Sequence, residues 1–263
     1  MFPNWLGLIA TVLSLCAFFL AFCLIKKWSF KAKAILFVVA SILALPGASF
    51  TIYYAHLFPD FDFYYQFRSS RGTEFLIVFL GVAGGALAGM LPLLARLFPL
   101  LGVAAFSFVP FCKPFLGPIP NGILTEKWDG EVCLQSTSST CGLASMASVL
   151  KVLGEDVSEP EIAHEAHSYS RGTEAWYLAR VARARGYEVE FQFTDPGEFP
   201  EEHYPSVVGV NLDGIGHFIP ILGKEGELFI TGDPLTGREV LSRSELEELY
   251  TFTGFQMAVR KKP

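Results

Sequence analysis

Long apolar runs without charge fill most of the first 117 residues and constrain the architecture more than any other feature. The first run, residues 5–25, contains no charged residue and is long enough to cross a bilayer as a helix. Similar runs follow at residues 34–54 and 75–95, whereas residues 97–116 form a marginal run because Pro99 and Pro110 interrupt it. The sequence therefore predicts three to four transmembrane helices and a lipid bilayer as a partner.

Charge divides the chain at about the same place. Residues 1–117 carry eight Lys or Arg against three Asp or Glu, whereas residues 118–263 carry twelve against 23. An acidic second half argues against nucleic acid as a partner and favours cationic substrates. We therefore expect a membrane region in residues 1–117, joined by a proline-rich linker to a water-soluble domain in residues 118–263.

Lysines between the first two predicted spans indicate the orientation in the membrane. The loop contains Lys26, Lys27, Lys31 and Lys33, and loops rich in Lys and Arg stay on the cytoplasmic side. The N-terminus and the aromatic loop 56–74 then lie outside. With four spans the soluble domain also lies outside the cytoplasm, and this is our prediction for an integral protein of the plasma membrane. A re-entrant segment 97–116 would instead leave the domain inside.

Gly81, Gly85 and Gly89 recur at four-residue intervals within the third predicted span. Small residues at this spacing let helix backbones approach closely in a membrane. The pattern predicts close helix packing, either within this chain, with a membrane partner or between two copies.

Cys141 lies at the predicted start of a helix in the soluble half. The polar run 136–140 supplies cap residues, and apolar residues then recur on one helix face at Leu143, Met146, Ala147, Leu150 and Leu153. A cysteine in the first turn lies near the positive end of the helix dipole, which stabilises a thiolate. Small side chains at Gly142, Ala144 and Ser145 suggest room for a substrate chain beside the helix.

The remaining pattern of the soluble half predicts helices first and strands second. Helices are expected from residue 158 and over residues 173–185, with a short one at residues 242–250. Five strands are expected at residues 187–193, 206–211, 217–222, 227–231 and 255–260. Helices followed by an antiparallel sheet indicate an α+β fold class.

His217 begins one of these strands, and Asp233 follows the next. A four-residue turn at residues 223–226 would place Asp233 diagonally opposite His217, within side-chain reach. A carboxylate in that place orients an imidazole, so Cys141, His217 and Asp233 have the residue types of a nucleophile, a base and an orienting group. Pro220 cannot donate to a strand ladder and therefore predicts an edge strand or a bulge.

The other cysteines and histidines receive less specific interpretations. His164 and His167 lie three residues apart on a predicted helix, where a solvated helix face is favoured over a metal site, and His203 has no obvious partner. We assign no metal and no cofactor. A disulfide between Cys133 and Cys141 remains open, whereas the cysteines in or beside apolar runs behave as small hydrophobic residues; these are Cys16, Cys23 and Cys112.

The order Gln135, Cys141-Gly142, His217-Phe218 and Asp233-Pro234 resembles a known family. Residues 120–260 are similar to the double-glycine leader peptidases that process bacteriocin precursors, which are papain-like cysteine peptidases often joined to ABC transporters. The resemblance implies that Cys141 is the nucleophile, His217 the general base and acid, and Asp233 its orienting group. It further implies that Gln135 donates to the oxyanion of the tetrahedral intermediate.

The leading hypothesis is therefore a membrane-anchored cysteine endopeptidase acting on a peptide or protein precursor. The resemblance implies cleavage after a pair of small residues such as Gly-Gly. The sequence departs from the transporter-linked members because it shows no ATPase half, so we expect no coupled cleavage and export within this chain. Two alternatives remain open: a catalytically silent module that binds peptides, and a thiol-dependent acyl transferase that passes the acyl group to an amine.

Overall fold

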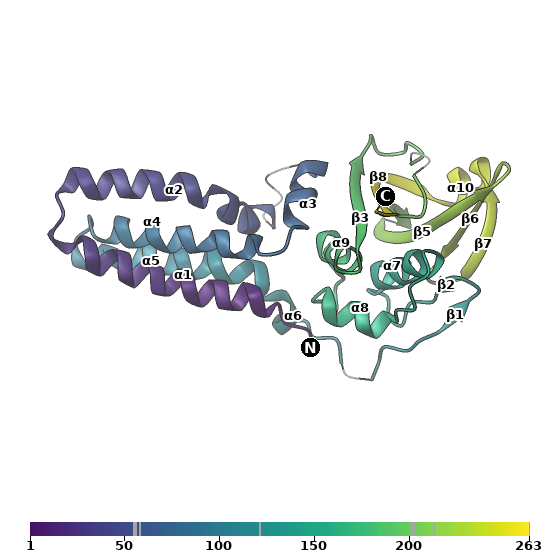
Figure 1. The fold of residues 1–263 in the computed structure, drawn as a ribbon, viewed down its shortest axis with the longest axis horizontal. Helices are drawn as coiled ribbons and strands as arrows, with labels where there is room; N and C mark the ends of the chain where they lie inside the picture. Colours follow the sequence, from purple (N-terminus) through teal and green to yellow (C-terminus); the bar gives the residue numbers. More distant parts are fainter. Residues whose placement is uncertain (55–56, 58, 121, 201–202, 213, 263) are drawn as a thin grey trace. The chain divides into compact units, whose positions relative to one another are not determined.

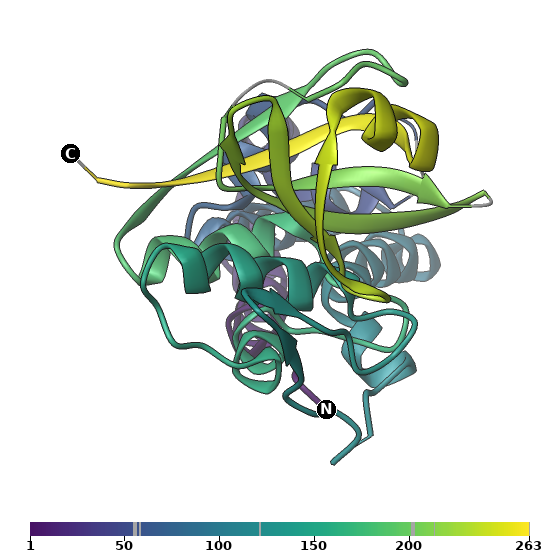
Figure 2. The ribbon, with the colours of Figure 1, turned by 90° about the vertical axis from the view of Figure 1, so that its right-hand side faces the viewer.

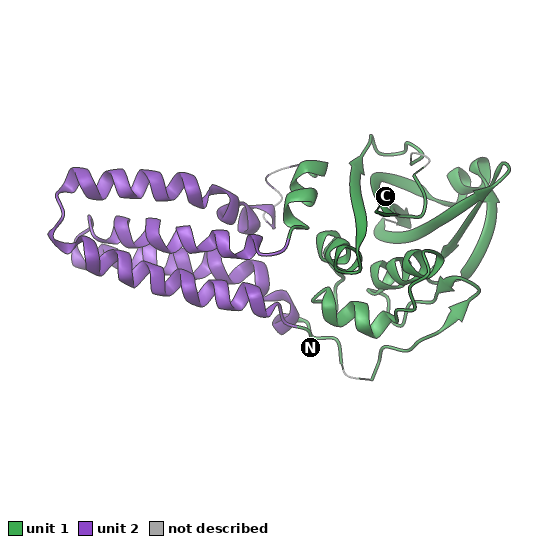
Figure 3. Cartoon of the chain, viewed as in Figure 1, with its two compact units in different colours: residues 1–2, 60–70, 117–263 green, residues 3–59, 71–116 purple. Residues whose placement is uncertain are grey.

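The chain divides into two compact units, coloured separately in Figure 3. The computed structural model describes every residue except 55–56, 58, 121, 201–202, 213 and 263, so parts of the aromatic loop and of the linker lie outside the described residues. Unit 1 comprises residues 1–2, 60–70 and 117–263, and unit 2 comprises residues 3–59 and 71–116. A segment between the second and third predicted spans, residues 60–70, therefore belongs to the same unit as the second half of the chain.

Unit 2 consists of helices joined by short turns (Figure 1). Its α-helices are α1 (Trp5–Leu24), α2 (Phe30–Tyr53), α4 (Val78–Ala88), α5 (Leu97–Phe108) and α6 (Lys113–Leu116). Its 3₁₀ turns are η1 (Ile25–Lys27), η2 (Thr73–Ile77), η3 (Leu93–Arg96) and η4 (Val109–Phe111). Asn4 and Ser29 cap α1 and α2, since their side chains accept from the backbone N–H groups of Gly7 and Ala32.

Three helical stretches of the described chain are long and apolar enough to cross a membrane: Trp5–Lys27, Phe30–Tyr53 and Leu93–Phe111. Helices Asp62–Arg68 and Thr73–Ala88 qualify only as a pair, and they meet at an angle of 97°. The first two stretches lie where the sequence predicts them. The last begins at Leu93 rather than residue 97, because the preceding helix already ends near Gly89 and Pro92 begins a new turn.

The glycine stripe of α4 packs against the first helical stretch of the same chain. A Cβ atom added to Gly81 would lie 1.8 Å from the carbonyl oxygen of Ser14, and one added to Gly85 would lie 2.3 Å from that of Phe18. A Cβ atom on Gly89 would lie 2.8 Å from the Ile25 side chain. The close helix packing expected from this spacing is thus present within one chain.

Unit 1 contains a six-stranded sheet in the order β3-β8-β4-β5-β6-β7, and every neighbouring pair is antiparallel. The strands are β3 (Tyr187–Phe193), β4 (Ser206–Leu212), β5 (Ile215–Glu225), β6 (Leu228–Asp233), β7 (Gly237–Ser242) and β8 (Thr251–Lys261). A small hairpin, β1 (Trp128–Asp129) and β2 (Val132–Cys133), precedes them. Strand β8 lies inside the sheet, between β3 and β4. Strand β3 therefore joins the other strands only after β8 has been added.

Helices α7 (Cys141–Val152), α8 (Glu159–Glu165) and α9 (Ala175–Ala184) lie together on one side of this sheet, and α10 (Arg243–Leu249) follows β7 (Figures 1 and 2). The α+β fold class expected from the sequence is confirmed, because helices come first in unit 1 and an antiparallel sheet follows. One detail of α7 differs from the expectation. Residues 142–150 are all buried, so α7 is a central helix rather than one with a single apolar face.

The strand that carries His217 departs from the expected pairing. The turn between β5 and β6 lies at Gly226 and Glu227, where Gly226 has φ 61°, so the expected turn at residues 223–226 is wrong. Pro220 lies in an interior strand, which corrects the edge expectation. However, β6 pairs with β5 only from Ile221 onward, and the register of this pair shifts between Ile221 and Gly223, which confirms a bulge. Pro220, which has no N–H to donate, therefore lies outside the hydrogen-bond ladder between β5 and β6.

Helix α3 (Asp62–Arg68) is an integral part of unit 1. The ring of Tyr65 is buried, with centroids 5.0–6.0 Å from those of Trp176, Phe191, Phe193 and Phe255. The side chain of Gln66 donates to the carbonyl oxygen of Val189 at 3.1 Å, and the Arg180 guanidinium donates to that of Arg68 at 2.7 Å. Residues 60–70 thus complete the core beneath β3 and satisfy a carbonyl of this edge strand.

Candidate active site

Cys141 is the first residue of α7 and is partly exposed. Its preceding residue, Thr140, occupies the N-cap position, but the Thr140 side chain makes no capping hydrogen bond. Thr140 therefore takes the expected cap position without the expected capping hydrogen bond, because its hydroxyl donates to the carbonyl oxygen of Thr137 at 3.2 Å. The backbone N–H groups of the first turn consequently remain without intrahelical acceptors beside the thiol.

Small residues after Cys141 bring α7 close to β5 rather than leaving room for a substrate. A Cβ atom on Gly142 would lie 3.2 Å from the side chains of Leu178 and Phe218. The Ser145 hydroxyl donates to the carbonyl oxygen of Phe218 at 3.0 Å. Because Phe218 follows His217 directly, this close packing sets the distance between the thiol and the imidazole.

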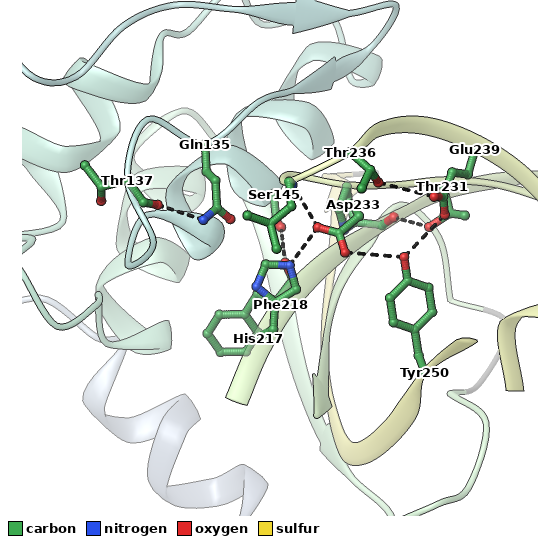
Figure 4. Close-up of polar contacts among 12 residues, drawn as sticks. Gln135, Thr137, Ser145, His217, Phe218, Thr231, Asp233, Thr236, Glu239 and Tyr250 are labelled. Carbon is green, nitrogen blue, oxygen red and sulfur yellow. Dashed lines mark hydrogen bonds and ion pairs between the residues drawn. The ribbon is translucent and has the colours of Figure 1, made fainter. Parts of the chain in front are cut away.

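His217 lies on β5, is 8% exposed, and contacts both other members of the predicted triad. Its Nε2 lies 2.8 Å from Oδ1 of Asp233 (Figure 4). The side chain of Cys141 also interacts with the imidazole and helps to raise the pKa of His217. The fold therefore brings Cys141, His217 and Asp233 into one contact chain from α7, β5 and the end of β6.

Several donors converge on the carboxylate of Asp233, which is 4% exposed. Besides His217, the backbone N–H of Leu235 donates to Oδ1 at 2.8 Å. The hydroxyl of Tyr250 lies 3.4 Å from Oδ2 and 3.3 Å from a carboxylate oxygen of Glu239 (Figure 4). Sequence reasoning missed Tyr250, since only the return of the chain through β7 and α10 brings it to Asp233.

The charges of the pair stabilise each other. Burial lowers the pKa of a histidine, but the hydrogen bonds and charges of Asp233 and Cys141 outweigh it and raise the pKa of His217 to about 9. Burial raises the pKa of a carboxyl, yet the hydrogen bonds from His217 and Leu235 lower that of Asp233 below its usual value. At neutral pH an imidazolium next to a carboxylate is therefore the favoured state.

Gln135 lies in the loop before α7. Its backbone N–H donates to the carbonyl oxygen of Pro234 at 2.9 Å, and its side-chain Nε2 donates to that of Thr137 at 2.7 Å (Figure 4). The amide oxygen Oε1 is buried and has no hydrogen-bond partner among the described residues. A buried acceptor without a partner costs free energy, so folding alone does not account for the placement of this side chain.

The remaining candidates lie apart from this cluster. The ring of His164 contacts Phe2 and that of His167 contacts Tyr177, while His203 bonds to the side chain of Gln192. Among the described residues, no three His, Cys, Asp or Glu side chains are grouped as metal ligands are. Cys133 and Cys141 are both free thiols, so the disulfide alternative is wrong.

Two curated proteins are similar in sequence to about half of this chain. A protein of Methanothermobacter thermautotrophicus named only as uncharacterized is 26% identical over 127 residues, which cover 48% of this chain and 87% of that protein. The probable functional amyloid protease FapD of Pseudomonas aeruginosa is 24% identical over 135 residues, which cover 46% of this chain and 58% of FapD.

Two solved structures are also similar. The peptidase domain of Streptococcus ComA, a bifunctional ABC transporter, is 22% identical with a TM-score of 0.41, and the match covers 49% of this chain and 96% of that domain. A double-glycine motif protease from an AMS/PCAT transporter, solved with its leader peptide, is 22% identical with a TM-score of 0.42, covering 56% and 99%.

The model of the peptidase C39 family matches residues 129–263, more than half of the 263-residue chain. The matched region includes Gln135, Cys141, His217 and Asp233. The chain therefore belongs to the peptidase C39 family.

Proposed function

We propose that this chain is a membrane-anchored cysteine endopeptidase that cleaves a peptide or protein precursor. The observation that carries the proposal is the contact chain from Asp233 through His217 to Cys141 within the region matched by the peptidase family. A thiol, an imidazole and a carboxylate in this order are the groups that acyl transfer through a thioester requires.

In the proposed reaction the Cys141 thiolate attacks the carbonyl carbon of the scissile bond and forms a C–S bond. The oxyanion that results accepts hydrogen bonds from the side-chain amide of Gln135 and from a backbone N–H at the start of α7. The His217 imidazolium then gives its proton to the leaving amine as the C–N bond breaks. Asp233 holds the ring and stabilises its positive form throughout.

Hydrolysis of the thioester returns the site to its starting state. Neutral His217 takes a proton from water, the hydroxide attacks the carbonyl carbon, and the C–S bond breaks to release a carboxylic acid. The Cys141 thiolate and the His217 imidazolium are restored. We further propose that the scissile bond follows a pair of small residues such as Gly-Gly, as the motif resemblance implies.

We also propose that unit 1 lies outside the cytoplasm. Residues 1–2, 60–70 and 117–263 form one compact unit, and a water-soluble unit lies on one side of a membrane. The chain must then cross an even number of times between residues 70 and 117. With an even number of crossings, Leu93–Phe111 can span the membrane only if Thr73–Ala88 spans it as well. The chain then has four spans. Sixteen residues reach about 24 Å, so this third span needs a locally thinner bilayer.

The charges of the opposite loops support this orientation. The lysines between α1 and α2, together with Arg96 in the first turn of the fourth span, lie on the side away from unit 1 in a four-span arrangement. Loops with such charges stay in the cytoplasm.

The test of the proposed function compares native membranes that carry either the wild-type chain or the Cys141→Ala variant. Mass spectrometry of protein N-termini should show at least one new N-terminus, following a small-residue pair, that depends on Cys141. The variant should retain the uncleaved precursor. Identical N-termini in both samples would overturn the peptidase proposal, and retention of peptides by both chains would favour a silent binding module.

A further inference from the structure

Glu159 is a fully buried carboxylate outside the predicted triad. It is the first residue of α8 and its side chain is 0% exposed. Burial is the main reason why the pKa of Glu159 is raised above its usual value. Burying a carboxylate costs free energy unless nearby donors satisfy it, so the identity of its donors indicates its role.

Among the described residues, the donors to this carboxylate come from the loop at residues 136–140. The backbone N–H of Ser136 donates to Oε1 of Glu159 at 3.2 Å, and the Ser136 hydroxyl donates to Oε2. The Thr140 hydroxyl, which donates to the carbonyl oxygen of Thr137, also interacts with the carboxylate and lowers its pKa. The buried carboxylate thus bonds to Ser136 at the start of this loop and interacts with Thr140 at its end.

The two ends of the loop adjoin the two groups that act on the substrate in the proposed reaction. Ser136 directly follows Gln135, and Thr140 directly precedes Cys141. The middle of the loop is tied to the same groups, because the carbonyl oxygen of Thr137 accepts from both the Gln135 amide and the Thr140 hydroxyl. Movement of this loop would therefore change the distance between the oxyanion donor and the nucleophile.

We propose that Glu159 is a positioning residue that fixes the Gln135 amide relative to the Cys141 thiol. The inference rests on the proposed function, since it assumes that these two groups act on the same carbonyl. Glu159 is too deeply buried to touch a substrate, so its influence runs through Ser136 and Thr140. A displacement of about 1 Å in a catalytic group can cost on the order of a hundredfold in rate.

The variant Glu159→Ala should lower kcat by about ten- to a hundredfold and leave KM within about twofold. Glu159→Gln should restore most of this loss. Its amide oxygen still accepts from the Ser136 N–H, while the Ser136 hydroxyl can donate to the carbonyl oxygen of Thr125, 3.0 Å away. If Glu159→Ala does not fold, Ser136→Ala, which removes the hydroxyl donor to the carboxylate, replaces it with the same expected direction.

The matched control is Glu161→Ala, two residues further along the same helix. Glu161 is exposed and closes the capping box of α8 with Ser158, so its loss weakens α8 without touching the 136–140 loop. A general effect of α8 stability would lower kcat in both variants. A positioning role lowers it only in Glu159→Ala.

The measurement uses the full chain in detergent with a fluorogenic peptidyl-Gly-Gly aminomethylcoumarin as the probe, followed by hydrogen exchange of residues 135–141. A fall in kcat together with faster exchange of this segment, confined to Glu159→Ala, supports the proposal. A wild-type kcat in Glu159→Ala, or an equal fall in Glu161→Ala, overturns it. A wild-type chain that does not cleave the probe overturns the proposed function instead. The rate of hydrogen exchange in residues 135–141 then decides whether Glu159 holds the loop.

Discussion

The Ser145 hydroxyl donates a 3.0 Å hydrogen bond to the carbonyl oxygen of Phe218, which joins the helix that begins at Cys141 to the strand that carries His217. Ser145 lies about one helical turn after Cys141, and Phe218 follows His217. The contact therefore links the backbones beside both groups and limits their relative movement.

The variant Ser145→Ala should lose about 1 kcal/mol in the free energy of unfolding and about tenfold in kcat/KM. The matched control is Ser148→Ala on the same helix, because the Ser148 hydroxyl accepts from the N–H of Cys133 and donates to Ala144 without reaching β5. Its stability should also fall, while turnover per folded molecule should stay near the wild-type value. Equal turnover in the two variants would contradict this role of Ser145.

Activity should decline as the pH rises through about 9, because the imidazolium of His217, whose pKa is raised to about 9, loses its proton there. The free energy of unfolding should also fall as the pH rises. The folded state binds this proton more tightly than the unfolded state, so the free energy of unfolding falls between about pH 6.5 and 9, by at most ~1.4 kcal/mol per pH unit. A pH profile of kcat/KM and chemical unfolding of the full chain in detergent measure both.

Asp233→Asn should move the alkaline limb of that profile to lower pH, because the variant removes the charge that supports the imidazolium. The fold should persist, since Asn can still accept from the N–H of Leu235. An alkaline limb at the wild-type pH in this variant would exclude Asp233 as the partner that sets the pKa of His217.

Iodoacetamide should alkylate Cys141 and spare Cys133 in the folded chain near neutral pH. Cys141 is partly exposed, whereas Cys133 is 0% exposed and burial raises the pKa of its thiol to about 12. Site-resolved mass spectrometry gives both rates in one sample, and His217→Ala should slow the reaction of Cys141. Both cysteines should react alike in denaturant. Equal rates in the folded chain would refute an activated thiol at Cys141.

Gln135→Ala should lower kcat by about a hundredfold, because one donor to the oxyanion is lost. Alkylation of Cys141 by iodoacetamide forms no tetrahedral oxyanion, so its rate should remain near the wild-type value in the same variant. A fall in both rates would show that Gln135 supports the cysteine helix rather than the oxyanion.

A phosphatase that is active only outside the cytoplasm should be active when fused after Pro263, and a reporter that requires the cytoplasm should be inactive there. The expectation follows from the even number of crossings between residues 70 and 117 and from the lysines of the first loop. External protease should also shave unit 1 from intact cells. The reverse reporter pattern would place the peptidase unit inside.

The sequence predicted the contact between His217 and Asp233 better than the turn and the strands that hold these residues. His217 and Asp233 meet although the expected turn at residues 223–226 is wrong, because in the observed register Asp233 is still within diagonal reach of the histidine strand. Strand β7 was not predicted, because apolar and polar residues alternate only weakly in residues 237–242. Its pairing with β6 depends on tertiary packing.

Glu159 and Tyr250 could not be predicted from any local pattern. Glu159 reads as an ordinary acidic residue in the first turn of a helix, and only the packing of α8 against the 136–140 loop shows that it is buried. Tyr250 reaches Asp233 because β6, β7 and α10 fold back on one another. Contacts between residues far apart in sequence depend on tertiary packing, which local propensity does not record.

The insertion of α3 into unit 1 has a consequence for the order of synthesis. Residues 60–70 emerge well before β3 and β8, yet Tyr65 packs against rings from α9, β3 and β8. During synthesis the aromatic face of α3 therefore stays uncovered until residues 71–116 and nearly all of unit 1 have been made. A chain truncated to begin at residue 118 would lack this partner and expose the rings of Trp176, Phe191 and Phe255 to water. Residues 60–70 would therefore have to accompany residues 117–263 for unit 1 to keep the core that it has here.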